Sequence, residues 1–206
     1  FLGQMLVLYI LCLKLCYERK EIDKKTFSFK VKSLLELSKN VKKTLSTENQ
    51  IQTVCKSFVD AKGSMFLGRG FSYPIALEGA LKLKELAYVH AEGYPAGEMK
   101  HGPLALIEDG MPVVVLAPRD EYFKKTISNM QEVIARGAKV LLITNKSKDE
   151  VLHENIWQSI KVENTNDDLL PFLITIPLQK LAYHSALNKG YDIDKPRNLA
   201  KSVTVE

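Results

Sequence analysis

Short apolar runs and helical patterns alternate along the last three quarters of the chain. Apolar residues recur at helical spacing over 73–90, 121–136 and 171–189. Four runs rich in branched apolar residues have the length of buried strands, and they cover 65–67, 113–117, 139–144 and 159–162. Strands separated by helices form a parallel sheet covered on both faces. The pattern therefore predicts a doubly wound α/β domain, whose ligands bind in the turns at the carboxyl ends of the strands.

Residues 1–45 have a helical pattern that weakens at 22–25 and again near Asn40. We therefore expect two helices and a connector. The apolar stretch 1–13 is too short for a membrane span, which needs about 20 residues, so we expect a buried helix without membrane function. Its abrupt start suggests that something preceded Phe1. A third helix is expected over 51–59, with a Ser or Thr cap before it and an end near Gly63.

Composition narrows the class of protein. Hydrophobic residues make up 46% of the chain and charged residues 26%, as in ordinary globular proteins. Three cysteines and four scattered histidines form neither a disulfide framework nor a metal pattern, so we expect a cytoplasmic protein without metal or cofactor. Cys12 and Cys16, on the apolar first segment, are expected to be buried packing residues.

The net charge of +5 raises the question of nucleic-acid binding. Basic residues between Glu18 and Lys43 alternate with acidic ones, which is typical of solvated helix faces rather than of a surface that follows phosphates. No nucleic-acid partner is therefore expected. A modest positive excess also suits small anionic substrates such as sugar phosphates.

The first predicted strand runs into a glycine turn, Gly68-Arg-Gly70. Tyr73 occupies the position where a dinucleotide-binding fingerprint needs its third glycine, so that fingerprint is absent. Ser72 is a plausible cap for the next helix. The helix amino end can favour an anion, or the glycines can simply serve a tight turn, and both interpretations stay open.

A narrow charged stripe runs along the helix that follows. At 100° per residue, Glu78, Lys82 and Glu85 fall within about 60°, with apolar residues on both sides. Such a stripe suits a cleft or a subunit boundary, where Lys82 keeps carboxylates charged and Glu85 acts as a base. A purely structural ion-pair ladder is the alternative.

Two further places carry candidate chemistry. His101 stands before Gly-Pro, and an imidazole is suited to moving protons near neutral pH, although a surface histidine would look the same. In the tail after Asp194, the planar guanidinium of Arg197 is suited to bidentate binding of phosphate or carboxylate. Lys201 is a candidate amine nucleophile if it is desolvated. A frayed basic terminus is the alternative.

Several motifs together resemble one enzyme family. The sequence has LGRG at 67–70, LEGALKLKE at 77–85, HAEGYPAGEMKHGPLAL at 90–106 and PRNLAKSVTVE at 196–206. In order and spacing these resemble the isomerizing glutamine:fructose-6-phosphate aminotransferases, the glucosamine-6-phosphate synthases. The resemblance runs in register from about Met65 to the last residue.

The resemblance implies a division into three parts. A helical segment would cover 1–45, the second sugar isomerase (SIS) domain of the synthase half, with a flavodoxin-like sheet, would cover 46–190, and an irregular tail acting as an active-site lid would cover 191–206. In the family, ammonia from glutamine replaces the ketose oxygen of fructose 6-phosphate to give glucosamine 6-phosphate.

The resemblance also implies roles for six residues. Lys201 would form a Schiff base with the open-chain ketose, and Glu85 would move the proton between C1 and C2. His101 would assist ring opening from the neighbouring subunit, which implies a homodimer. The substrate-binding residues would be Lys82, Arg197 and Ala200.

The departures from the family matter as much. The chain lacks the Ser/Thr-rich phosphate loop of the first SIS domain, and none of its cysteines matches the glutaminase nucleophile. We therefore expect this polypeptide alone to be inactive, and to need the first SIS domain and the glutaminase domain as partners. The alternative is a non-catalytic SIS module that binds a sugar phosphate or nucleotide sugar as a regulatory signal.

Overall fold

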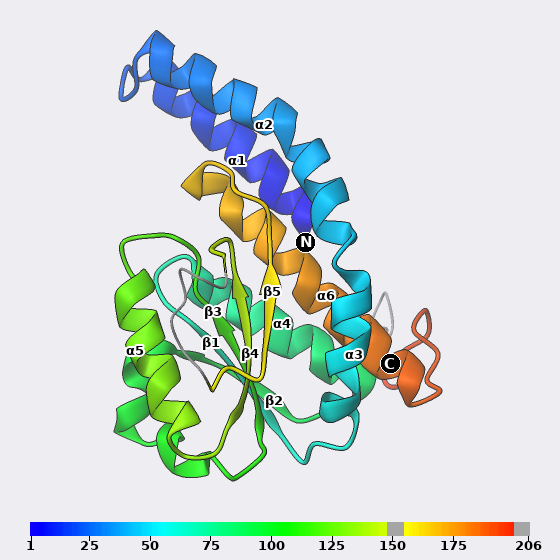
Figure 1. Ribbon diagram of the computed structural model, residues 1–206. Coiled ribbons are helices and arrows are strands. Elements are labelled where there is room, and N and C mark those ends of the chain that lie inside the picture. The colour runs from blue at the N-terminus through cyan, green and yellow to red at the C-terminus, as the bar shows by residue number, and fades with distance from the viewer. Residues whose placement is uncertain (148–154, 200–206) are drawn as a thin grey trace, which may run out of the picture.

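The computed structural model describes residues 1–147 and 155–199, and it contains one five-stranded parallel sheet with helices on both faces (Figure 1). The strand order is β2-β1-β3-β4-β5, and all four neighbouring pairs are parallel. The strands are β1 (Ser64–Gly68), β2 (Ala91–Pro95), β3 (Pro112–Leu116), β4 (Lys139–Thr144) and β5 (Gln158–Lys161). The predicted doubly wound α/β class is thereby confirmed.

The α-helices of the described residues match the predicted ones closely. They are α1 (Leu2–Glu18), α2 (Lys24–Leu45), α3 (Glu48–Val59), α4 (Ser72–Ala87), α5 (Phe123–Ile134) and α6 (Leu170–Asn188). Short 3₁₀ turns are η1 (Ala96–His101), η2 (Pro103–Leu106) and η4 (Asp167–Leu169).

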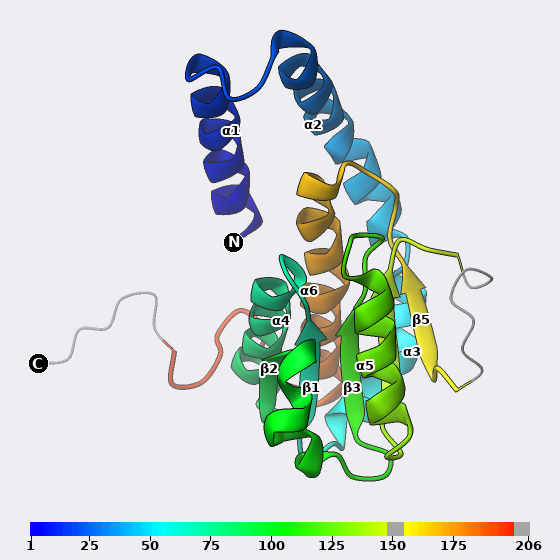
Figure 2. The same ribbon diagram turned by 90° about the vertical axis from the view of Figure 1, so that its left-hand side faces the viewer.

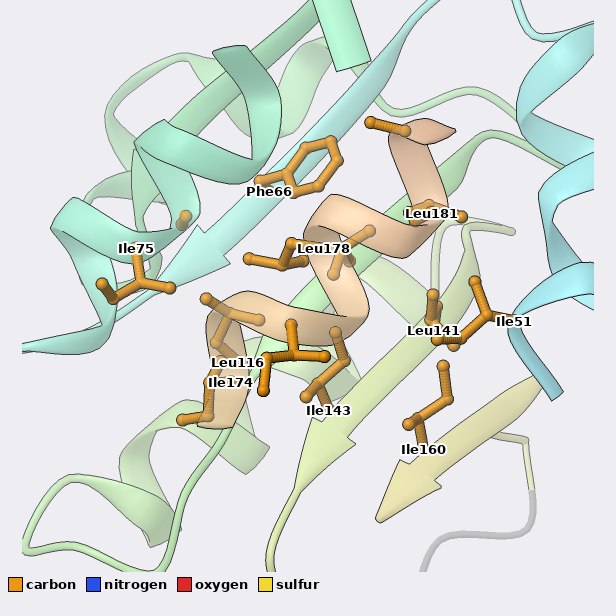
Figure 3. Close-up of a cluster of buried hydrophobic side chains, with 14 of the residues drawn as sticks. Ile51, Phe66, Ile75, Leu116, Leu141, Ile143, Ile160, Ile174, Leu178 and Leu181 are labelled. Atoms are coloured by element: carbon orange, nitrogen blue, oxygen red, sulfur yellow. The ribbon is translucent and has the colours of Figure 1, made fainter. Parts of the chain in front are cut away.

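The sheet divides the interior into two hydrophobic clusters. Along β1 the side chain of Phe66 packs with α3, α4 and α6, while those of Met65 and Leu67 pack with α5 and η1. This alternation follows from the two-residue period of a strand. Figure 3 shows the first cluster, in which Leu178 and Ile174 of α6 lie against the strands. Every residue of β1 and β3 is buried, which is why these strands have continuous apolar sequences.

The edge strand β2 was not predicted. It pairs with β1 from Ser64 and Ala91 to Gly68 and Pro95, and four of its five residues are only half-buried. A five-residue strand that contains Gly93 and ends in Pro95 has little β propensity, so the pairing edge of β1 determines its conformation.

The helix α1 is not buried, so that expectation was wrong. Leu13 is the one buried residue of α1, and the helix and α2 form a hairpin that projects from the α/β domain (Figure 2). Cys12 is exposed and Cys16 is half-buried, which contradicts the expected packing role of both. Nothing among the described residues covers the outer face of α1. Within that part of the chain no helix is long and apolar enough to cross a membrane.

The course of α2 and the caps of α3 and α4 also differ from the sequence prediction. Helix α2 runs through Asn40 without a break, and its cap is Asp23, whose carboxylate accepts a hydrogen bond from Thr26 N at 2.7 Å. Thr47 stands at the cap position of α3, but its hydroxyl donates to Thr44 O at 2.8 Å instead. Ser72 lies in the first turn of α4 and does not cap it.

Candidate active site

Three charged side chains lie together on the outer face of α4, as the sequence predicts. The Nζ of Lys82 is 2.5 Å from Oε2 of Glu85 and 3.7 Å from Oε1 of Glu78. The side chains of Lys82 and Glu85 are 27% and 29% exposed, whereas the neighbouring Leu77 and Leu81 are 42% and 40% exposed. A charged pair that is better shielded than the apolar residues on one side of it differs from an ordinary solvated helix face.

The cation of this cluster is held in its charged form. Burial by itself lowers the pKa of Lys82, but the hydrogen bond to Glu85 and the charges of Glu78 and Glu85 outweigh burial and raise that pKa. Glu78 Oε1 is buried without a hydrogen-bond donor, so its compensation is the ion pair with Lys82. The arrangement places a carboxylate, Glu85, beside a fixed positive charge, which suits a group that takes up and returns a proton.

The tail is attached at the end of the same helix. Tyr88 follows Glu85 by three residues, about one helical turn. Its Oη accepts a hydrogen bond from Arg197 N at 2.7 Å, and the Arg197 guanidinium lies 4.0 Å from the ring centroid. The structure therefore brings Arg197 to the Glu85 end of α4. The other two predicted tail residues, Ala200 and Lys201, lie outside the described residues.

His101 is separated from these residues within one chain. It ends η1, its side chain is 77% exposed, and Nε2 lies 3.8 Å from Glu98 Oε2. Lys100 holds η1 to α5 through an ion pair with Glu132 at 3.0 Å. Since α5 and α4 cover opposite faces of the sheet, a single chain does not place His101 beside Glu85.

The turns at the carboxyl ends of the strands contain polar links that the sequence interpretation missed. Asn145, after β4, accepts from Arg119 N at 2.7 Å and donates to Asn164 Oδ1 at 3.0 Å, which ties three turns together. Burial raises the pKa of Asp120 in the same region. The position of Asn145 directly after a buried strand was the available signal.

The glycine turn after β1 has a steric cause. A Cβ at Gly68 would lie 2.2 Å from the backbone oxygen of Ser72, closer than any real contact, and Gly70 has a φ of +55°. Both positions therefore require glycine for the turn itself. This observation favours the tight-turn interpretation of the motif over an anion site.

A hollow of about 730 Å³ lies at the opposite, amino ends of the strands, between Ser64, His90 and Pro112. Neither the α4 cluster nor His101 lines it. Most of its charged side chains are exposed, and only Glu92 of β2 is half-buried, so the hollow carries no argument about chemistry.

The comparisons with known proteins agree on one family. Residues 57–189 match the SIS domain. A glutamine–fructose-6-phosphate aminotransferase (isomerizing) of Bartonella quintana (strain Toulouse) is 46% identical over 206 residues, which is 100% of this chain and 34% of that protein. The protein of the same name from Bacteroides thetaiotaomicron is 48% identical, with 100% and 33% covered. The chain thus spans about a third of the length of these curated relatives.

Solved structures show the same likeness. The C-terminal domain of a glucosamine-fructose-6-phosphate aminotransferase from Francisella tularensis superposes with a TM-score of 0.91 and 41% identity, over 95% of this chain and 55% of that chain. A glucosamine-6-phosphate deaminase from Thermotoga maritima superposes with a TM-score of 0.67 and 26% identity, over 93% of this chain and 53% of that chain.

Proposed function

Since the chain belongs to the SIS domain family and is homologous to the C-terminal SIS region of isomerizing glutamine–fructose-6-phosphate aminotransferases, we propose that it supplies half of an aldose–ketose isomerase and amination site. The substrate is fructose 6-phosphate and the product glucosamine 6-phosphate. The observation that carries the proposal is the shielded pair of Lys82 and Glu85, with the tail attached at Tyr88, the C-cap of the same helix.

In this proposal the tail supplies the amine nucleophile, Lys201, and α4 supplies the base, Glu85. The Lys201 amine adds to the C2 carbonyl of the open-chain ketose, and loss of water gives a Schiff base. Ammonia then replaces Lys201 at C2, so the overall change is ketose plus ammonia to amino sugar plus water. Glu85 takes the proton from C1 and returns it at C2, while Lys82 balances the charge of the carboxylate.

His101 acts in ring opening, and it comes from a second copy of the chain. Its exposure and its position across the sheet from α4 support supply between subunits. The active form is therefore a homodimer. Arg197 serves to hold the tail, and Ala200 contacts the substrate beside Lys201.

In this proposal the chain consists of a helical segment (1–45), an SIS domain (46–190) and a tail (191–206). The phosphate group of the substrate is bound by a first SIS domain outside this chain. Ammonia comes from a separate glutaminase domain. The isolated polypeptide should thus give no glucosamine 6-phosphate above background in a coupled assay. Clear turnover by the chain alone would contradict this division of labour.

The roles of the site residues are tested in the chain joined to the missing SIS and glutaminase units. Lys201→Ala should abolish synthesis and leave the fold intact, and borohydride should trap a fructose 6-phosphate adduct on Lys201 of the parent. Synthesis that survives in Lys201→Ala would favour the non-catalytic SIS module that binds a sugar phosphate as a signal.

The α4 pair has a matched control on the same helix. Lys82→Met should lower kcat by about 10²-fold or more, as loss of a group that supports proton transfer does. Lys84→Met changes an exposed lysine two residues away and should leave kcat within about twofold. Equal effects of the two substitutions would remove Lys82 from the site.

A further inference from the structure

Helix α4 ends in an unusual backbone conformation. Tyr88, at its C-cap, has φ 53° and ψ 33°, the left-handed region that non-glycine residues rarely adopt. The described chain holds two other non-glycine residues with positive φ, Lys20 and Asn198. Two of the three thus lie at the junction of α4 and the tail, and surrounding contacts must hold such conformations in place.

The contacts of Tyr88 explain what holds this junction. One side chain makes three interactions with the tail: its Oη accepts from Arg197 N, its ring faces the Arg197 guanidinium, and it packs on the Tyr191 ring with centroids 4.8 Å apart. In this left-handed turn the side chain contacts the tail, whereas the side chain of a residue in helical conformation leans back along its own helix.

The described tail has few other attachments. At its start Tyr191 N donates to Ala186 O of α6 at 3.1 Å, and Ile193 packs against the core. Asp192 Oδ1 accepts from the backbone N–H groups of Asp194 and Lys195, and these two contacts lie within the tail itself. Arg197 and its neighbours Asn198 and Leu199 are exposed. Tyr88 is therefore the side chain that fixes the position of the tail around Arg197 against the domain.

We propose that Tyr88 is a positioning residue, which sets the register of the tail against α4 so that the amine that follows meets Glu85 and Lys82. This inference rests on the proposed function of Lys201. Lys201 follows Arg197 by four residues, and an extended chain spans at most about 3.6 Å per residue. The contact between Tyr88 and Arg197 thus limits the volume that the Lys201 amine can reach. It therefore keeps the effective concentration of the amine at the ketose high.

The contact between Tyr88 and the tail is tested on this chain without an activity assay. Tyr88→Phe keeps the ring and removes the acceptor of Arg197 N–H, so amide hydrogen exchange at Arg197 should accelerate about fivefold. Tyr88→Leu also removes the ring, so trypsin cleavage after Arg197 should accelerate about tenfold or more. Tyr191→Phe keeps a ring for packing and serves as the matched control, with both rates within about twofold of the parent.

A merely structural role for Tyr88 predicts a different result. It predicts a lower melting temperature of the whole domain with no selective release of the tail, and that result would overturn the proposal. The proposal would also be overturned if Tyr88→Leu left both the rate of cleavage after Arg197 and the melting temperature unchanged.

The catalytic consequence is measured in the chain joined to the missing SIS and glutaminase units. Tyr88→Leu should lower kcat about tenfold or more and leave KM for fructose 6-phosphate within about twofold, because the phosphate is gripped elsewhere. Tyr88→Phe should recover most of kcat. An unchanged kcat in Tyr88→Leu with a released tail would overturn the positioning role.

The two proposals can fail separately. Synthesis that survives in Lys201→Ala contradicts the proposed function, whereas the exchange and trypsin rates still decide whether Tyr88 holds the tail.

Discussion

Helices α1 and α6 are both apolar along most of their length, yet their surroundings are opposite. In α6 thirteen residues are buried, because the helix lies between the sheet, α3 and α4. In α1 Leu13 alone is buried, and Val7 and Leu8 are each 64% exposed. An apolar sequence therefore indicates that a helix can be buried, but what covers it is decided by the other layers of the fold.

A polar contact links the α1–α2 pair to the start of α6. Tyr9 of α1 donates to Asp168 Oδ2 at 3.3 Å, and Lys30 of α2 pairs with the same carboxylate, just before α6 begins. Only the inner side of α1, with Leu2, Met5 and Leu6, packs against the core of the domain. The stability of the domain should thus depend far more on α6 than on the outer side of α1.

The largest expected effect comes from shortening a leucine in each helix. Leu173 of α6 is fully buried, so Leu173→Ala should lower the free energy of unfolding by about 2–5 kcal/mol. Leu8→Ala in α1 should change it by less than about 0.5 kcal/mol. Urea unfolding followed by circular dichroism measures both. Similar losses would show that the outer face of α1 is covered in solution.

Replacing two helical glycines by alanine should change the free energy of unfolding by smaller amounts, and the two changes should have opposite signs. A Cβ at Gly79 would lie 2.8 Å from Leu178 Cδ1 and 3.0 Å from Phe66 Cδ1, so Gly79→Ala should destabilise by about 1–3 kcal/mol, less the gain in helix propensity. At Gly3 of α1 nothing lies within 4 Å, so Gly3→Ala should stabilise by up to about 1 kcal/mol. Thermal unfolding of both variants gives the signs, and stabilisation by Gly79→Ala would refute close packing of α4 on α6.

The smallest effect concerns the polar contact between α3 and α6. Glu48 Oε1 lies 2.9 Å from Lys180 Nζ and 2.9 Å from His184 Nε2, and these two hydrogen bonds lower the pKa of Glu48. A carboxyl whose folded pKa is lowered stabilises above its unfolded pKa, and it loses that contribution as the pH falls through the folded value.

Glu48→Gln should therefore lower the melting temperature at pH 7 by a small amount, under about 2 °C, because the pair is partly exposed. The difference from the parent should persist down to the ordinary glutamate pKa of about 4.3 and shrink as the pH falls further. Melting curves between pH 3 and 7 test this, and a difference that grows toward acid would contradict the assigned charge state.

The predictable and the unpredictable parts of the structure differ in physical origin. The central strands follow from continuous apolar runs, and the charged stripe on α4 follows from local spacing, because the 3.6-residue period of a helix fixes which side chains share a face. The strand β2 depends on the free edge of β1, and the exposure of α1 depends on what lies beside it. Neither cause is local, so neither is visible in the pattern.

The site shows the same division. The spacing of Lys82 and Glu85 predicts their contact, whereas no spacing signal identifies Tyr88, whose left-handed turn appears only once the helix end and the tail are both in place. The family motifs identified the tail as important, but the way in which it is attached to the domain was visible only in the structure.

The place of α6 in the chain has a consequence for biosynthesis. It is the most buried helix of the domain and the last one of the described residues, so a ribosome synthesises it only after β1 to β5. Until then the apolar faces of α3 and α4 that it covers, together with one side of the sheet, stay open to water. Nascent chains that pause before residue 170 should accordingly be bound by chaperones, and release should follow once α6 is complete.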